Sequence, residues 1–190
     1  MHIVYLHGFN SSPASVKAEQ ARRYFSAVAD VQIHVPALPP EPRRAMGVVE
    51  ALIDRLQGES LGFIGSSLGG YYSLYWHQRI GCPAVLVNPA MRPYELLCDY
   101  LGENTNLYTG EVYEVKPEHM EQLKALEAHT LSPRQIFLLT QTGDEVLDYR
   151  QALDKVYGAR AWIKPHGDHA FQAFESTLPA IEAFFRGRLS

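Results

Sequence analysis

The chain has 190 residues, of which 46% are hydrophobic and 20% are charged, and its formal net charge is −4. This length and hydrophobic content are typical of one domain with a substantial core, so we expect residues 1–190 to form a single domain. The negative charge provides no basic surface for a phosphate backbone, which argues against nucleic acid as a partner.

Cysteine content and the N-terminal sequence indicate the compartment. Two cysteines are too few for a disulfide framework, which suits a reducing environment. The chain opens with an apolar segment at residues 3–6, without a basic region or a long apolar run before it. No window approaches 18 uninterrupted apolar residues. We therefore expect a cytoplasmic protein with no membrane partner.

Short apolar segments alternate with amphipathic segments along most of the chain. The predicted strands are residues 1–6, 31–35, 61–64, 84–87, 136–140 and 159–164. The predicted helices are residues 14–29, 46–56, 68–80, 149–157 and 171–186. Pro179 in the last helix is compatible only with a first turn. This alternation predicts an α/β fold: a mostly parallel, doubly wound sheet of about six strands, with right-handed crossovers.

One segment interrupts this alternation of strands and helices. Residues 89–134 carry two helical patterns, at about 91–101 and 117–128, around a loop rich in Tyr, Gly and Asn. Insertions of this length in an α/β domain often form a lid or a pocket wall. We expect this segment to be a short helical cap.

The pattern Gly65-x-Ser67-x-Gly69 follows a predicted strand directly and opens a predicted helix. This is the context of a nucleophile elbow, in which a tight turn lifts a serine hydroxyl above the sheet. Glycines two positions before and after the serine keep the strained turn free of clashes. Ser67 is therefore the predicted nucleophile.

A serine nucleophile needs a base, and the base needs a carboxylate to hold its tautomer. The order Ser67, Asp144, His169 along the chain is the order found in α/β-hydrolases. His169 is preferred as the base over His166, because it follows a Gly-Asp turn and precedes the last helix. Asp144 is preferred as the acid because it lies at a strand end. The competing acids have ordinary structural roles available: Asp148 as a helix N-cap and Asp168 within its own loop.

The oxyanion of an acyl-transfer reaction needs two backbone N–H donors. Leu68 follows the nucleophile at the positive end of a helix, and Phe9 follows the first strand, where Gly8 permits a close approach. We predict these two donors, and we expect His7 to be a structural hydrogen-bonding residue.

Three further residues are candidates for substrate contact. Asn10 and Arg92 follow strands, and Tyr71 lies on the helix after Ser67. The aromatic residues of this helix that could line an acyl pocket are Tyr71, Tyr72, Tyr75 and Trp76. Packing against the sheet is the alternative role for the aromatic residues of this helix. The group His166, Asp168 and His169 lacks a partner metal motif elsewhere, so no metal is predicted.

Several blocks of this sequence resemble a known family. They are YLHGFNSSP at 5–13, GSSLGGY at 65–71, NPAMRPYELL at 88–97, DYLG at 99–102, QTGDEVLDYR at 141–150 and HAF at 169–171. With them the chain resembles the small bacterial esterases named after YqiA, within the α/β-hydrolases. This resemblance implies esterase activity, with acyl-CoA thioesters among the substrates, a cytoplasmic location, and a triad of Ser67, Asp144 and His169.

The function predicted from the sequence is that of a serine esterase. It hydrolyses small carboxylic esters, and acyl-CoA thioesters as a further class, through an acyl-enzyme intermediate and without a metal or organic cofactor. Two alternatives stay open: a peptidase or amidase using the same triad, and a non-catalytic ligand-binding protein with a hydrolase fold.

Overall fold

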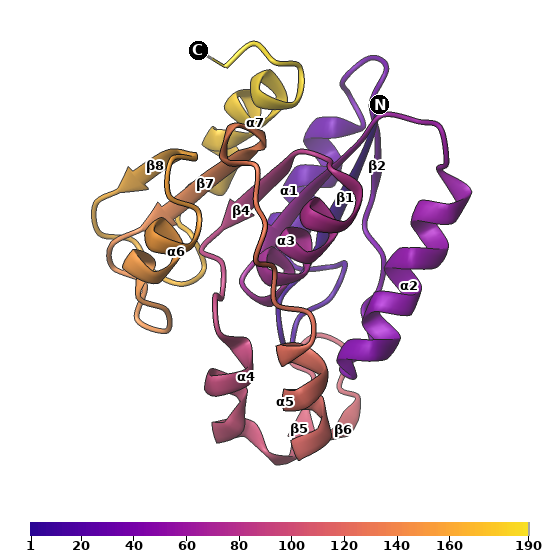
Figure 1. Cartoon of the computed structure of the whole chain (residues 1–190), viewed down its shortest axis with the longest axis vertical. Coiled ribbons are helices and arrows are strands. Elements are labelled where there is room, and N and C mark those ends of the chain that lie inside the picture. Colours follow the sequence, from indigo (N-terminus) through magenta and orange to yellow (C-terminus); the bar gives the residue numbers. More distant parts are fainter. Residues whose placement is uncertain (190) are drawn as a thin grey trace.

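The computed structural model describes residues 1–189, and its centre is one six-stranded sheet, all parallel, in the order β2-β1-β3-β4-β7-β8 (Figure 1). The strands are β1 (His2–Leu6), β2 (Gln32–His34), β3 (Leu61–Ser66), β4 (Ala84–Val87), β7 (Ile136–Gln141) and β8 (Arg160–Lys164). The predicted doubly wound α/β sheet of six strands is confirmed. The continuous apolar runs of β4 and β7 are fully buried, because helices cover both faces of a parallel sheet.

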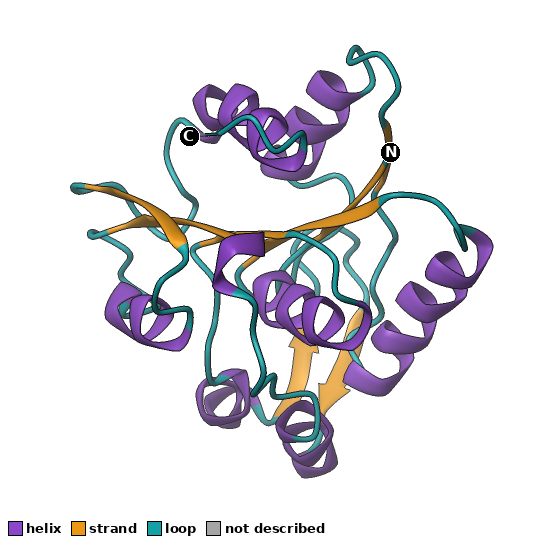
Figure 2. Cartoon of the chain, turned by 45° about the horizontal axis from the view of Figure 1, so that its top comes forward, coloured by secondary structure: helices purple, strands orange, loops and turns teal. Residues whose placement is uncertain are grey.

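Helices cover the two faces of the sheet (Figure 2). One face carries α1 (Val16–Phe25) and α7 (Leu178–Phe185), which share a buried cluster with Ile3, Tyr5 and Phe137. The other face carries α2 (Pro42–Arg55), α3 (Leu68–Ile80) and α6 (Tyr149–Lys155), which share a second cluster. The four central strands β1, β3, β4 and β7 therefore contribute alternate side chains to two separate apolar layers.

The last predicted helix, residues 171–186, is wrong in its first part. The structure has a 3-10 turn, η3 (Phe174–Thr177), before α7, and Pro179 lies in the first turn of α7. Phe171 and Ala173 have φ angles of 60° and 56°. Because a left-handed backbone cannot continue an α-helix, the helix can begin only after these residues.

Residues between β4 and β7 form α4 (Pro93–Leu96), η1 (Leu97–Tyr100), β5 (Gly102–Thr105), β6 (Val112–Val115), α5 (Pro117–Lys124) and η2 (Pro133–Gln135). The prediction of a loop between the two helices of the cap is wrong, because β5 and β6 pair there as an antiparallel hairpin. The predicted first helix, 91–101, is also shorter. Gly102 has a φ of 101°, which ends the helical path and starts the hairpin.

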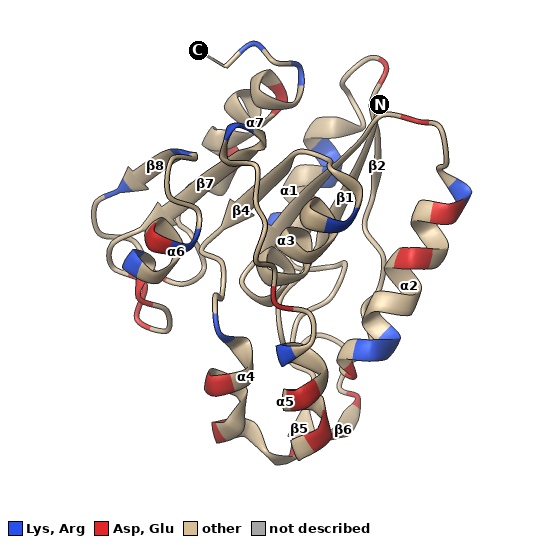
Figure 3. Ribbon diagram, viewed as in Figure 1, with Lys and Arg blue, Asp and Glu red and all other residues tan. Residues whose placement is uncertain are grey.

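This insertion lies beyond the end of β4 from which α4 continues, at the carboxyl edge of the sheet (Figure 1). Acidic residues gather on α4, α5 and the hairpin, whereas both signs of charge are interspersed over the rest of the visible face (Figure 3). Among residues 1–189, no helix has both the length and the apolar character needed to cross a bilayer.

Candidate active site

Ser67 lies at the sharp turn between β3 and α3, with φ 55° and ψ −121°. This is a costly backbone conformation for a residue with a side chain. The surrounding backbone maintains it: Ser67 N–H donates to the Val87 carbonyl at 3.0 Å, and the Ser67 carbonyl accepts from Gly70 at 2.9 Å and Ala90 at 3.1 Å. The predicted elbow geometry is present.

The flanking glycines are required by close packing. A Cβ atom on Gly65 would lie 2.2 Å from the Gly69 carbonyl oxygen, and a Cβ atom on Gly69 would lie 1.9 Å from the Leu6 carbonyl oxygen. Both obstacles are backbone atoms that no side-chain rotation can remove. The spacing of the motif therefore follows from how closely α3 approaches β1 and β3.

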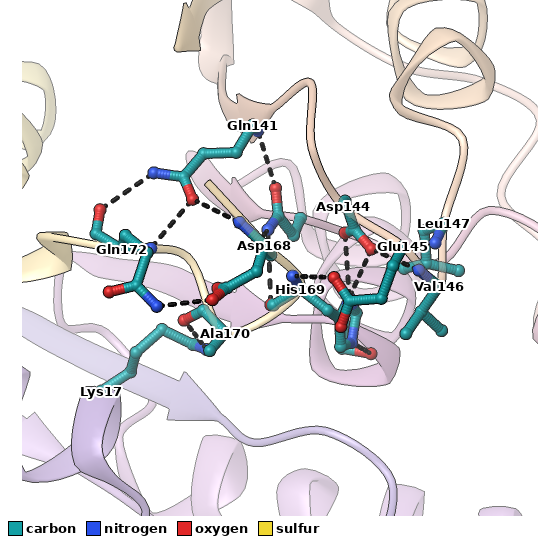
Figure 4. Close-up of polar contacts among 12 residues, drawn as sticks. Lys17, Gln141, Asp144, Glu145, Val146, Leu147, Asp168, His169, Ala170 and Gln172 are labelled. Carbon is teal, nitrogen blue, oxygen red and sulfur yellow. Dashed lines mark hydrogen bonds and ion pairs between the residues drawn. The ribbon is translucent and has the colours of Figure 1, made fainter. Parts of the chain in front are cut away.

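Three side chains from distant segments form a continuous hydrogen-bonded chain. His169 Nε2 lies 3.1 Å from Ser67 Oγ, and His169 Nδ1 lies 2.9 Å and 3.1 Å from the two carboxylate oxygens of Asp144 (Figure 4). An imidazole with its proton on Nδ1 donates to Asp144 and accepts the Ser67 hydroxyl proton at Nε2. The structure thus brings together the three residues that the sequence singled out.

Asp144 is held as a carboxylate by its surroundings. Its side chain is only 2% exposed, and Oδ1 accepts the backbone N–H groups of Val146 and Leu147, both at 2.9 Å. Burial by itself raises the pKa of Asp144, but the hydrogen bonds from His169 and from these N–H groups outweigh it. The pKa of Asp144 therefore lies below its usual value.

The competing candidates lie elsewhere. Asp148 caps α6 by accepting the Arg150 N–H at 3.0 Å, as its alternative role required. Asp168 accepts a hydrogen bond from the Gln172 side chain, and His166 is exposed. Among the hydrogen bonds of residues 1–189, the Ser67 hydroxyl meets His169 and not His166, and the ring of His169 meets Asp144 but neither Asp148 nor Asp168, so the geometry favours Asp144 and His169.

The loop that carries His169 is held by two amide side chains, a role that the sequence did not indicate; one of them, Gln141, is labelled in Figure 4. Asn88 Nδ2 donates to the carbonyls of Asp168, at 2.9 Å, and His169, at 3.3 Å. Gln141 Oε1 accepts the N–H groups of Asp168 and Gln172. Gln141 ends β7 and Asn88 directly follows β4, and this strand-end position was the signal available in the sequence; only the structure shows that both residues hold this loop.

Lys17 also supports the loop from α1. Its ammonium donates to the Ala170 carbonyl at 2.6 Å (Figure 4). Burial lowers the pKa of Lys17, while Asp168 and Asp144 act in the opposite sense. A cation is therefore placed beside the residue that follows His169, a contact that no sequence motif indicated.

The two predicted oxyanion donors lie beside Ser67. Leu68 is the first residue of α3, and a Cβ atom on Gly8 would lie 3.1 Å from Ser67 Cβ, so the loop containing Phe9 runs directly past the serine. Within residues 1–189, the backbone N–H groups of Phe9 and Leu68 take part in no backbone–backbone hydrogen bond. Both donors are therefore available to a ligand.

His7 has a structural role. Its Nε2 accepts the Leu38 N–H at 3.1 Å, and Nδ1 faces the Gly8 carbonyl at 3.1 Å, which fits donation from Nδ1. Burial lowers the pKa of His7, which keeps the ring in the neutral form that this pattern needs.

Two cavities lie on either side of the loop after β1. One, of about 450 Å³, is lined by Ser67, His169, Lys17 and the hairpin residues Leu107 and Tyr108. The other, of about 360 Å³, is more apolar and is lined by Leu38, Val48, Leu68, Tyr72 and Tyr113, among others. Residues 7–11 contribute to both, and the volumes are in the range of small-molecule sites.

The three candidates for substrate contact have different surroundings. Asn10 lines both cavities. Tyr71 is buried and donates its hydroxyl to the Leu123 carbonyl at 2.8 Å, so it packs α3 against the insertion. Arg92 is exposed and pairs with Glu95 at 3.6 Å. The structure brings Asn10 to the cavities, and it places neither Tyr71 nor Arg92 on their walls; Tyr72 lines one of them instead.

Within residues 1–189, no group of three or more His, Cys, Asp or Glu side chains is arranged to hold a metal ion. His169, a member of the one candidate metal-ligand set, instead contacts Ser67 and Asp144.

Known structures share this fold. A protein from Agrobacterium vitis S4 is similar with a TM-score of 0.74 at 18% identity, over 97% of this chain and 87% of that one. The carboxylesterase CesB from Bacillus subtilis is similar with a TM-score of 0.63 at 16% identity, over 98% of this chain and 84% of that one. XC6422 from Xanthomonas campestris is described as an α/β serine hydrolase without a lid. It is similar with a TM-score of 0.67 at 12% identity, over 98% of this chain and 81% of that one.

The sheet order, the elbow and these similarities define the class: the chain has the α/β-hydrolase fold. The model of the family described as Uncharacterised protein family (UPF0227) matches residues 2–186, and the chain belongs to that family. This is the YqiA-like family that the sequence blocks indicated, so the resemblance is confirmed.

Proposed function

We propose that this protein is a serine esterase in which Ser67, His169 and Asp144 act as a catalytic triad. The observation that carries this proposal is the unbroken hydrogen-bonded chain from Ser67 Oγ through His169 to Asp144, on a strained elbow inside a cavity. The structural similarity to a carboxylesterase and a serine hydrolase supports the same class of reaction.

The reaction follows from the positions of these groups. His169 Nε2 takes the Ser67 proton as Oγ attacks the ester or thioester carbonyl, and the N–H groups of Phe9 and Leu68 stabilise the oxyanion. His169 then protonates the leaving alcohol or thiol, which departs from the acyl-enzyme. Water, deprotonated by the same imidazole, releases the acid and restores Ser67. Asp144 stabilises the imidazolium at each step.

Replacement of the nucleophile tests the proposal. Ser67→Ala should reduce turnover by about 10⁴- to 10⁶-fold, because triad members act as a unit. We would measure hydrolysis of p-nitrophenyl esters from acetyl to palmitoyl alongside the matching acyl-CoA thioesters, and labelling by a fluorophosphonate.

Ser73→Ala is the matched control. It removes a buried hydroxyl from the same helix, where Ser73 donates to the Gly69 carbonyl at 2.8 Å, and it should keep activity and labelling. A folded Ser67→Ala protein that retains most of the activity would refute the esterase mechanism. The ratio of thioester to ester rates in the wild type decides whether thioesterase activity is part of the function.

A further inference from the structure

Two side-chain hydrogen bonds join the loop after β1 to the β5–β6 hairpin of the insertion. The Tyr113 hydroxyl donates to Asn10 Oδ1, across 103 residues of sequence. Asn106 Nδ2 donates to the Ser11 carbonyl at 3.0 Å, across 95 residues. The hairpin is therefore tied to the two residues that follow Phe9, a predicted oxyanion donor.

Aromatic contacts also join the loop after β1 to the insertion, at η1 and at the hairpin. The ring of Phe9 packs edge-to-face with Tyr100, at 5.2 Å between centroids, and with Tyr113, at 6.3 Å. Such arrangements have a preferred geometry and add to the free energy of burial. The side chain of Phe9 is thus held by the insertion, although its backbone belongs to the body of the protein.

The loop needs this external support. Asn10 has a φ of 50°, in the left-handed region, which asparagine enters at lower cost than most residues with a side chain but still less freely than glycine. Phe9 and Asn10 form an isolated turn, and residues 9–11 belong to no helix or strand, so no regular hydrogen-bond ladder holds this backbone. The contacts with the hairpin are therefore major restraints on the backbone between Gly8 and Ser12.

We propose that Tyr113 is a positioning residue: its hydroxyl holds Asn10, and through it the Phe9 N–H, in the place where that N–H stabilises the oxyanion. The proposal rests on the esterase function above and gives the insertion a part in the reaction beyond covering the site. Small displacements of a donor matter, because transition-state hydrogen bonds depend on preorganised geometry.

The chemistry of Tyr113 suits this role. Burial, with a further effect from Glu111, raises the pKa of Tyr113 to about 12. The hydroxyl therefore remains a donor to Asn10 throughout the neutral and mildly alkaline range in which esterases are assayed.

The test compares Tyr113→Phe with Tyr94→Phe in the full chain. Tyr113→Phe removes the bond to Asn10 and keeps the ring against Phe9. Tyr94→Phe removes another hydroxyl of the insertion, one that donates to Glu127 at 2.9 Å and lies away from the loop. For each protein we would measure kcat and KM, inhibition by a trifluoromethyl ketone that forms an oxyanion on the serine, and hydrogen exchange of a peptide covering residues 7–15.

For Tyr113→Phe we expect kcat to fall about 10- to 100-fold with KM within about threefold, and ketone affinity to fall in parallel with kcat/KM. Hydrogen exchange in residues 7–15 should accelerate at least about fivefold. Tyr94→Phe should match the wild type in kinetics, ketone affinity and hydrogen exchange. A fall in kcat without loss of ketone affinity, unchanged exchange, or equal effects of the two variants would overturn the proposal.

Failure of the esterase function gives a different pattern. A wild-type protein without Ser67-dependent hydrolysis or fluorophosphonate labelling would contradict the proposed function, and with it the catalytic role of Tyr113. Hydrogen exchange needs no substrate, so it would still show whether Tyr113 restrains the loop.

Discussion

At the scale of single residues, the site depends on how Asp144 is stabilised rather than on its distance from His169 alone. The carboxylate is almost wholly buried, which by itself favours its protonated form. Two backbone N–H groups and the imidazole reverse that preference. A carboxylate that stays ionised fixes the proton of His169 on Nδ1 and leaves Nε2 to act on Ser67.

This stabilisation should appear in the pH dependence of unfolding. Because the pKa of Asp144 is lower in the folded than in the unfolded chain, its contribution to stability is complete above the unfolded value of about 4. The contribution is lost as the pH falls through the folded pKa. The difference in the free energy of unfolding between wild type and Asp144→Asn should therefore be larger at about pH 6 than at about pH 3.

Urea denaturation at the two pH values measures this difference. Asp154→Asn, at an exposed position on α6, serves as the control and should show no such change. A difference between wild type and Asp144→Asn that stays constant or widens in acid would contradict the stabilised carboxylate.

At the scale of elements, β3 and α3 are packed so closely that neither Gly65 nor Gly69 can carry a side chain. The Gly69 contact with the Leu6 carbonyl shows this most clearly, since it joins α3 to the neighbouring strand β1. The elbow is therefore fixed by packing across two strands, and this packing holds Ser67 in its positive-φ conformation.

Alanine at Gly69 should consequently destabilise the protein. Its Cβ would meet backbone 1.9 Å away, so we expect a loss of about 2–3 kcal/mol or more in the free energy of unfolding, with loss of activity. Gly47→Ala is the opposite case, because Gly47 is an exposed position of α2 with nothing within 4 Å of an added Cβ. Alanine there should raise the free energy of unfolding by about 0.5–1 kcal/mol.

Thermal and urea unfolding of both variants provide the measurement. Equal effects at the two positions would mean that the close approach of α3 to β1 does not control the elbow.

At the scale of the whole molecule, the insertion is attached to the body at several separate points. Tyr71 on α3 reaches the Leu123 carbonyl, and Asn106 and Tyr113 reach the loop after β1. A third attachment is the ion pair of Glu127 with Lys155 on α6, at 2.8 Å, in which both side chains are more than three-quarters buried. The hydrogen bond from Lys155 lowers the pKa of Glu127, against the opposing effect of burial.

Breaking this ion pair should loosen the insertion. Lys155→Met removes the ammonium partner of Glu127 and leaves it the hydrogen bond from the Tyr94 hydroxyl. We therefore expect a loss of about 1–2 kcal/mol and faster hydrogen exchange across residues 93–127. Arg150→Met removes an exposed pair with Asp148 and should change stability by less than about 0.5 kcal/mol. An insertion that exchanges no faster in Lys155→Met than in Arg150→Met would show that this attachment is unimportant.

The sheet, the elbow and the three residues that the structure joins by hydrogen bonds could be predicted from the sequence. Runs of apolar residues and the Gly65-x-Ser67-x-Gly69 pattern are local signals, because a buried parallel strand and a strained turn each restrict the residues they accept. Strand-end positions then led to Asp144 and His169, since the carboxyl ends of parallel strands meet at one edge.

The hairpin of the insertion and the residues that support the site could not be predicted from the sequence and became visible in the folded structure. The strands β5 and β6 are short and have exposed residues, so the alternation that marks a half-buried strand is weak. The contacts of Asn88, Gln141 and Tyr113 join segments far apart in the chain, and no local pattern encodes which backbone group an amide or hydroxyl will meet. Local chemistry thus fixed which groups could react, and long-range packing fixed how they are held.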